Sequence, residues 1–167
     1  MRIWAVTVLL MLCLNAGAYA REAPTNVWRL DVTNLEADRE LIHTCLRQGD
    51  GASCEAVVQR PCLEAAAPTG PTTVAMRQCY WRAVAAWEDE MQEALARLQA
   101  HVDEARWREI QDSQRVWEAS MQADVGLVMD IYRGGSLSGV VGAHARATAT
   151  AQRALFLAGV LDMTDPH

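Results

Sequence analysis

The sequence predicts an all-α protein, a small disulfide-stapled helical bundle built on a long antiparallel helical hairpin plus a C-terminal helix. Apolar residues recur every three or four positions over two long stretches, and only about four residues around Asp103 separate the two. Four cysteines remain after an N-terminal export signal, an even number that suits disulfide pairing. The 167 residues are enough for one domain with a real core but not comfortably for two.

Residues 1–20 have the features of a signal peptide. Arg2 supplies the positive charge, residues 3–14 form an apolar run too short to span a bilayer, and Ala18-Tyr19-Ala20 matches a small-x-small cleavage motif. Cys13 raises the alternative of a lipidated cysteine, but Leu12 stands where a lipidation motif needs a small residue. We therefore expect a Sec-type signal cleaved after Ala20, and a periplasmic or secreted protein without a membrane span.

The four remaining cysteines are expected to form two disulfides. Three connectivities are possible for Cys45, Cys54, Cys62 and Cys79. We expect the sequence-local pairs Cys45–Cys54 and Cys62–Cys79, each stabilising the fold by about 2–4 kcal/mol. Zinc binding is the competing interpretation, because His43 lies two residues before Cys45, but the spacing contains no CxxC pair and an oxidising compartment would consume free thiols.

The mature chain is expected to begin with an extended entry segment, residues 21–33, because Pro24 and several β-branched residues disfavour helix. A single helical domain follows over residues 34–161. Thr33 and Glu36 match a capping box, so a first helix should begin here and run to about Arg47. Its expected inner face consists of Leu35, Ile42, Cys45 and Leu46.

A turn-rich segment connects this helix to the hairpin. Gly49-Asp50-Gly51 predicts a turn, and a short helix is expected over residues 54–60, with Pro61 opening a further helical turn. Pro68, Thr69, Gly70 and Pro71 form the clearest loop in the chain. The proposed Cys62–Cys79 ring encloses this loop and would hold it in place.

The hairpin consists of two long amphipathic helices. A threonine at 72 or 73 can cap the first helix, and the short connection makes the two antiparallel neighbours with Trp87, Trp107 and Trp117 between them. The stripe of the first helix comprises Met76, Tyr80, Val84, Trp87, Met91, Leu95, Leu98 and Val102. The stripe of the second comprises Trp107, Ile110, Gln114, Trp117, Met121, Asp124, Val128 and Ile131.

Gly134 suits a left-handed residue that ends the second helix. Ser136 or Ser138 can cap a last helix, which is expected to reach about Leu161, with residues 162–167 frayed. The expected inner face of this helix is rich in small residues and comprises Leu137, Val141, His144, Thr148, Ala151, Leu155 and Ala158. We expect His144 to lie at the edge of the core rather than to bind a ligand.

Composition excludes several classes of function. The net charge of −6, with no basic block, argues against nucleic acid binding. The chain contains no GxSxG, HExxH, CxxC or phosphate-binding glycine motif. Glu88, Asp89, Glu90 and Glu93 could form paired carboxylates for acid–base chemistry, but a solvated helix face is the simpler interpretation. We therefore expect a protein that is not an enzyme and uses no cofactor or metal.

Several short motifs resemble those of the LprI-type lysozyme-inhibitor family. Gln114, Arg115 and Trp117 match its Ala-Gln-Arg-x-Trp element, Gly134, Gly135 and Ser136 match its Gly-Gly-Ser turn, and Thr150 and Arg153 match its last element. Cys62 and Cys79 resemble the N-terminal cysteine pair of the family. The resemblance covers residues 62–157, whereas Val125 and Ala145 stand where the family has two later cysteines.

This resemblance implies an exported protein-binding module that blocks a lysozyme-type muramidase. The alternative is a non-enzymatic envelope scaffold or stress protein that binds another envelope protein through its helical faces. The matched motif positions are expected to be structural, with Gln114, Arg115 and Trp117 holding the hairpin to the Gly-Gly-Ser turn. Two loops are candidate partner-binding sites, namely Pro68–Pro71 and Arg133–Ser138.

Overall fold

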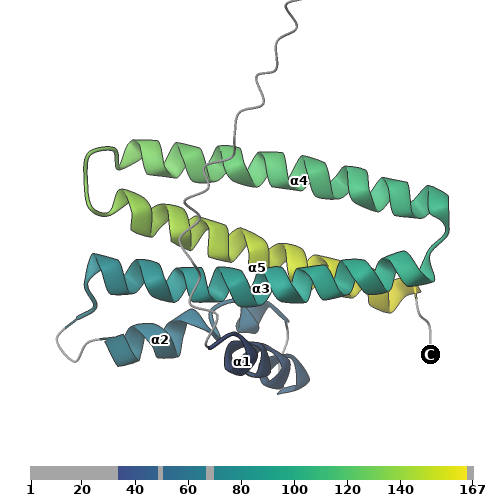
Figure 1. The fold of residues 1–167 in the computed structure, drawn as a ribbon, viewed down its shortest axis with the longest axis horizontal. Coiled ribbons are helices and arrows are strands. Elements are labelled where there is room, and N and C mark those ends of the chain that lie inside the picture. The colour runs from purple at the N-terminus through teal and green to yellow at the C-terminus, as the bar shows by residue number, and fades with distance from the viewer. Residues whose placement is uncertain (1–33, 49–50, 67–69, 165–167) are drawn as a thin grey trace, which may run out of the picture.

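The computed structural model describes residues 34–48, 51–66 and 70–164, and these form five α-helices and one short 3₁₀ helix (Figure 1). The elements in order are α1 (Leu35–Gln48), η2 (Gly51–Cys54), α2 (Gln59–Ala66), α3 (Thr73–His101), α4 (Glu104–Ile131) and α5 (Ser138–Thr164). The expected signal peptide, the entry segment and Thr33 lie outside the described residues. The expected all-α fold is confirmed, and the part of the chain that the structure describes contains no strand.

Helix α3 is the centre of the molecule. Helix α5 packs along one side of α3, and α1 and α2 pack against α3 on the other side (Figure 1). Helix α4 returns antiparallel to α3 but packs mainly on α5. The expected hairpin is therefore correct in direction and wrong in packing, because α5 takes the place against α3 that α4 was expected to fill.

The core lies between α3 and α5. Trp87, Val84 and Leu98 of α3 are fully or almost fully buried, as its stripe predicted. Small residues of α5 let the two backbones approach closely, and its buried apolar residues are Val140, Ala143, Ala147, Ala151, Ala154, Leu157 and Leu161. The inner face of α5 is rich in small residues, as expected, but it lies at a different angle around the helix axis from the expected face, since Leu137 and His144 are exposed. The ring of His144 lies 4.9 Å from that of Tyr80.

Helix α4 is the least buried of the long helices. Met121 is its one buried residue, and Trp107, Ile110, Gln114, Trp117 and Val128 are half-buried as the stripe predicted. Asp124 and Ile131 were expected on this face and are exposed, because the face continues through Val125 instead. Gly142 of α5 makes the close approach of α4 and α5 possible, since a Cβ on Gly142 would lie 2.6 Å from Cγ of Met129 in α4.

The N-terminal helices are fastened to α3 by covalent and ionic contacts. Both expected disulfides, Cys45–Cys54 and Cys62–Cys79, are confirmed. Asp38 is buried and accepts two hydrogen bonds from the guanidinium of Arg82, at 3.0 and 2.6 Å. This pair was not predicted, because an acidic side chain on a helix usually faces solvent. Leu46 was expected to be buried and is exposed.

The segment before α3 differs from expectation. In place of a helix over residues 54–60, η2 ends at Cys54 and α2 starts at Gln59. Pro61 therefore lies within the first turn of α2, where its missing N–H has no intrahelical acceptor to lose. Most of the expected turn at 49–51 lies outside the described residues.

The ends of the long helices follow local chemistry. The hydroxyl of Thr72 accepts the N–H of Ala75 and caps α3, and Asp103 caps α4 through the N–H of Arg106. Gly134 has a φ of +83°, which confirms the expected left-handed residue. Leu137 occupies the N-cap position of α5, since its carbonyl oxygen accepts the backbone N–H groups of Val140 and Val141. Neither Ser136 nor Ser138 therefore stands at the N-cap.

The last helix is longer than predicted. It extends to Thr164, so residues 162–164 are helical rather than frayed, and residues 165–167 lie outside the described part. Among the described residues, no helix combines the length and apolarity needed to cross a membrane.

Candidate functional site

The motif residues of α4 and α5 meet at a buried arginine. Arg153 donates from Nε to Oε1 of Gln114 at 2.9 Å and from Nη2 to Oγ of Ser113 at 3.1 Å. Gln114 in turn donates to the sulfur of Met91 in α3 at 3.4 Å. This chain of contacts joins α5, α4 and α3 near the middle of the bundle.

The Arg153 guanidinium has aromatic neighbours and is paired with neutral groups. Its Cζ lies 5.7 Å from the ring of Trp117 and 5.2 Å from that of Phe156, distances at which a cation is attracted to a ring. Burial lowers the pKa of Arg153 from its ordinary value. An arginine nevertheless keeps its proton in proteins, so Gln114 and Ser113 solvate a buried positive charge.

The other motif residues do not join this cluster. Arg115 points to solvent and pairs with Asp112. Thr150 is buried and donates from Oγ1 to the carbonyl oxygen of Arg146 at 2.8 Å, within α5. The Gly134-Gly135-Ser136 turn is exposed, and the part of α4 that follows Gln114, about 25 Å long, separates Gln114 from it. The expectation that Gln114, Arg115 and Trp117 hold this turn is therefore wrong.

The four acidic residues considered as catalytic carboxylates are paired with arginines. Arg39 of α1 contacts Glu90 and Asp89 at 2.9 Å and Glu93 at 2.6 Å. Glu88 contacts Arg146 of α5 at 2.7 Å. These contacts fasten α1 and α5 to α3, which is a structural use of the carboxylates. The described residues contain no cluster of three or more potential metal ligands.

The two candidate partner-binding loops lie at the same end of the molecule. Helices α3 and α5 both begin there, and a Cβ on Gly139 would lie 3.4 Å from Cδ of Arg77, which brings the starts of the two helices together (Figure 1). Gly70 and Arg133 are exposed, whereas Pro71 and Ser138 are half-buried. Pro68 and Thr69 lie outside the described residues. The exposed apolar side chains beside the α4–α5 turn are Tyr132 and Leu137.

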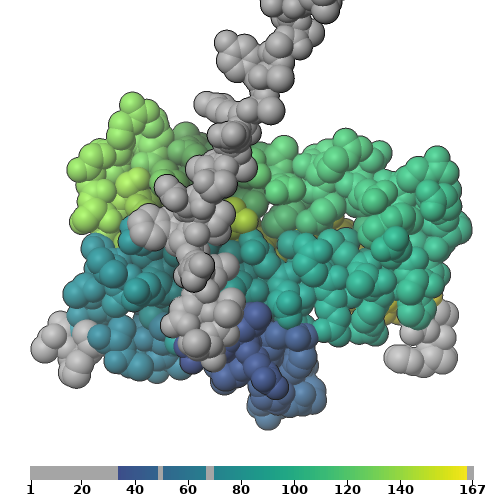
Figure 2. All heavy atoms as spheres, viewed as in Figure 1, coloured from purple at the N-terminus to yellow at the C-terminus, as the bar shows by residue number. Residues whose placement is uncertain are grey.

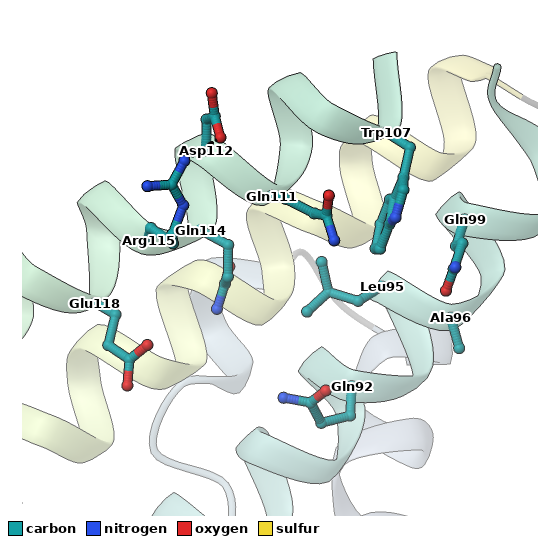
Figure 3. Close-up of a pocket in the computed structure, with 10 residues that line it drawn as sticks. All are labelled: Gln92, Leu95, Ala96, Gln99, Trp107, Gln111, Asp112, Gln114, Arg115 and Glu118. Carbon is teal, nitrogen blue, oxygen red and sulfur yellow. Dashed lines mark hydrogen bonds and ion pairs between the residues drawn. The ribbon is translucent and has the colours of Figure 1, made fainter. Parts of the chain in front are cut away.

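A groove between α3 and α4 was not predicted. The space-filling view shows the two helices side by side, with atoms of α5 visible between them (Figure 2). The groove encloses about 620 Å³, and Trp107, Gln111 and Leu95 point into it (Figure 3). Asp112 and Arg115 lie at its outer edge. The groove exists because α5 holds α4 away from α3, a tertiary effect that no local pattern reports.

Comparison with known families matches residues 62–157, more than half of the chain, to the family described as lysozyme inhibitor LprI. The chain belongs to the LprI family. The matched region comprises most of α2, then α3, α4 and most of α5, with the Cys62–Cys79 disulfide at its start. Helix α1 and the Cys45–Cys54 disulfide precede the LprI region. Comparison with curated proteins and with solved structures finds no match.

Proposed function

We propose that this LprI-family chain is an exported protein that binds a lysozyme-type muramidase and blocks it. The observation that carries the proposal is the family match, because LprI is a family of lysozyme inhibitors. The two disulfides support an extracytoplasmic location, since such bonds persist in oxidising compartments. The net charge of −6 would speed encounter with a basic lysozyme.

The end of the bundle that carries the two loops is the proposed contact surface. An inhibitor gains affinity when its binding loop is already ordered, because ordering a loop during binding costs free energy. The α4–α5 turn meets this requirement through internal hydrogen bonds. Gly135 donates to the carbonyl oxygen of Tyr132, the backbone N–H of Ser138 donates to that of Gly135, and the Ser138 hydroxyl donates to that of Met129.

Tyr132 and Leu137 are the proposed apolar anchors. They are 46% and 45% exposed, so a partner can bury them without any rearrangement of the bundle. Aromatic and aliphatic anchors at the centre of an interface carry much of its binding energy. Arg133 lies between them in the turn and pairs with Asp130.

An inhibition assay with mature, oxidised protein against several lysozymes tests the proposal. The wild-type chain should inhibit at least one lysozyme, and Tyr132→Ala combined with Leu137→Ala should weaken inhibition at least tenfold without lowering the unfolding midpoint. Met163→Ala is the matched control, because Met163 is 75% exposed near the opposite end. Absence of both inhibition and binding at micromolar concentration would contradict the proposal and favour the envelope-scaffold alternative.

A carboxylate mechanism is tested separately. Glu88→Gln with Glu90→Gln should leave inhibition unchanged, because both carboxylates are paired with arginines away from the loops. Loss of inhibition in a variant that still folds would contradict the structural role assigned to Glu88 and Glu90.

A further inference from the structure

We propose that the groove between α3 and α4 binds a linear, uncharged oligosaccharide. Trp107, which lines this groove, stands in the first turn of α4, whereas the α4–α5 turn follows the end of that helix. The groove is therefore separate from the proposed contact surface for a muramidase. Saccharide binding is independent of the proposed function and adds a second binding site to the bundle.

Glutamine side chains are concentrated in this groove. Four of the nine glutamines of the chain line it, two from each helix, namely Gln92, Gln99, Gln111 and Gln114. Gln114 bonds to Arg153 and Met91, but the amides of the other three have no hydrogen-bond partner among the described residues. An amide offers two N–H donors and a carbonyl acceptor, so three amides are available to a ligand.

Apolar side chains face the same space. Leu95 and the ring of Trp107 point into the groove beside the amide of Gln111 (Figure 3). Trp107 is half-buried, which leaves part of its ring for a ligand. A ligand of this site must therefore pack a nonpolar surface on an indole and pair its polar groups with amides. A pyranose ring does both, because its C–H groups form an apolar face and the hydroxyls around its edge donate and accept hydrogen bonds.

The groove is long enough for several sugar rings. A second hollow of about 280 Å³ adjoins it and shares Gln92, Gln114 and Glu118 with it. The wall that α4 provides runs from Trp107 in the first hollow to Met121 in the second, a length of about 21 Å. A linear oligosaccharide could follow this wall, whereas a single sugar would reach few of the amides.

The charges of the groove oppose an anionic ligand. Among the described residues that line the larger hollow, the one cation is Arg115, and it is paired with Asp112. Glu118 adds a carboxylate, to which the amide of Gln122 donates at 3.4 Å. A phosphate or carboxylate would meet this excess of negative charge with no unpaired cation to hold it. The charge therefore favours an uncharged ligand.

A protein segment fits this lining less well than a saccharide does. A helix that docks in a groove needs a continuous apolar surface, whereas glutamines stand on both walls here. An extended peptide commonly adds to an exposed sheet edge, and the part of the chain that the structure describes contains no strand. Amides combined with one indole are better matched to a chain of hydroxyl groups.

Titration of the mature, oxidised chain with sugars, in the absence of lysozyme, tests the proposal. The probes are chitotetraose and cellotetraose, uncharged tetramers with and without acetamido groups. At least one should shift the indole N–H signal of Trp107 in the nuclear magnetic resonance spectrum, with a dissociation constant of about 1 mM or lower. The Trp107→Phe variant identifies this signal by its absence. The matching monosaccharide should bind about fivefold more weakly or worse, because it reaches fewer amides.

Gln92→Leu combined with Gln111→Leu removes two amides and keeps side chains of similar size. The double variant should bind the tetramer about fivefold more weakly or worse. Its unfolding midpoint should not fall, since both residues are exposed and neither amide has a partner among the described residues. Gln78→Leu is the matched control, because Gln78 is an exposed amide near the start of α3, outside the groove, and it should bind as the wild type does.

Three outcomes would overturn the proposal. One is no shift of the Trp107 signal with either tetramer at about 10 mM, a concentration that would nearly saturate a site of millimolar affinity. Another is equal affinity of the wild type and the Gln92→Leu, Gln111→Leu variant. The third is tighter binding of a sulfated tetramer or of a leucine-rich helical peptide, which would assign the groove to an anion or to a protein partner.

Discussion

Arg153 of α5 donates from Nε to Oε1 of Gln114 of α4 at 2.9 Å, and the side chain of Gln114 reaches on to the sulfur of Met91 in α3. Arg153 is 8% exposed. A buried charge is tolerated when hydrogen bonds replace its hydration. Gln114 therefore links the three long helices while it solvates the charged group of this cluster, and both residues lie within the region matched to the LprI family.

Gln114→Ala should destabilise the protein by about 1–3 kcal/mol, because it removes one of the two side-chain acceptors of a buried guanidinium. Urea unfolding with the disulfides intact measures the change. Replacing Arg153 by Met should make the Gln114→Ala change much less costly, since the charge that needs the amide is then gone. Equal costs in both backgrounds would contradict a direct coupling. Arg115→Ala is the control and should stay within about 0.5 kcal/mol of the wild type.

The Asp38–Arg82 pair should respond unequally to loss of its two members. The Asp38 side chain is 3% exposed and that of Arg82 is 31% exposed. Arg82→Met leaves a carboxylate buried without its cation and should cost about 3–5 kcal/mol. Asp38→Ala leaves an arginine that can turn to water, so the cost should be smaller. Denaturant unfolding shows which of the two variants loses more stability. A larger loss for Asp38→Ala than for Arg82→Met would contradict the prediction.

Local patterns predicted the helices, their caps at Thr72 and Asp103, and the disulfides, because each depends on residues close in sequence. The rotation of α5 was not predictable in the same way. Small residues occur on several of its faces, so composition alone does not show which face meets α3. The burial of Asp38 depends on Arg82, which lies 44 residues away in the sequence. The α3–α4 groove depends on a third helix, α5, which packs against both of the others. The family resemblance singled out Gln114 and Arg153, but the contact between them was not predicted.

Trp87→Ala should cost about 3–5 kcal/mol, because the ring is 1% exposed at the centre of the core. Trp117 is half-buried beneath Arg153, so Trp117→Ala should cost less, about 1.5–3 kcal/mol. Thermal or urea unfolding followed by circular dichroism compares the two.

The indole Nε1 of Trp87 has no hydrogen-bond partner among the described residues. Trp87→Phe should therefore cost much less than Trp87→Ala, since it keeps a ring and removes an unsatisfied donor. A cost for Trp87→Phe close to that of the alanine variant would indicate that Nε1 has a partner, such as a bound water molecule.

Two glycine-to-alanine changes should have opposite signs. Gly134 has a φ of +83° in the α4–α5 turn, a conformation in which an L-side chain costs about 1–2 kcal/mol. Gly134→Ala should therefore destabilise the protein even though nothing lies within 4 Å of the new methyl group.

Gly159 lies within α5 with equally open space, and alanine there should stabilise the helix by about 0.5–1 kcal/mol. Unfolding midpoints of the two variants measure these effects, and because neither position is crowded, any difference in sign reports backbone conformation alone. Stabilisation by Gly134→Ala would show that the turn does not require a left-handed residue.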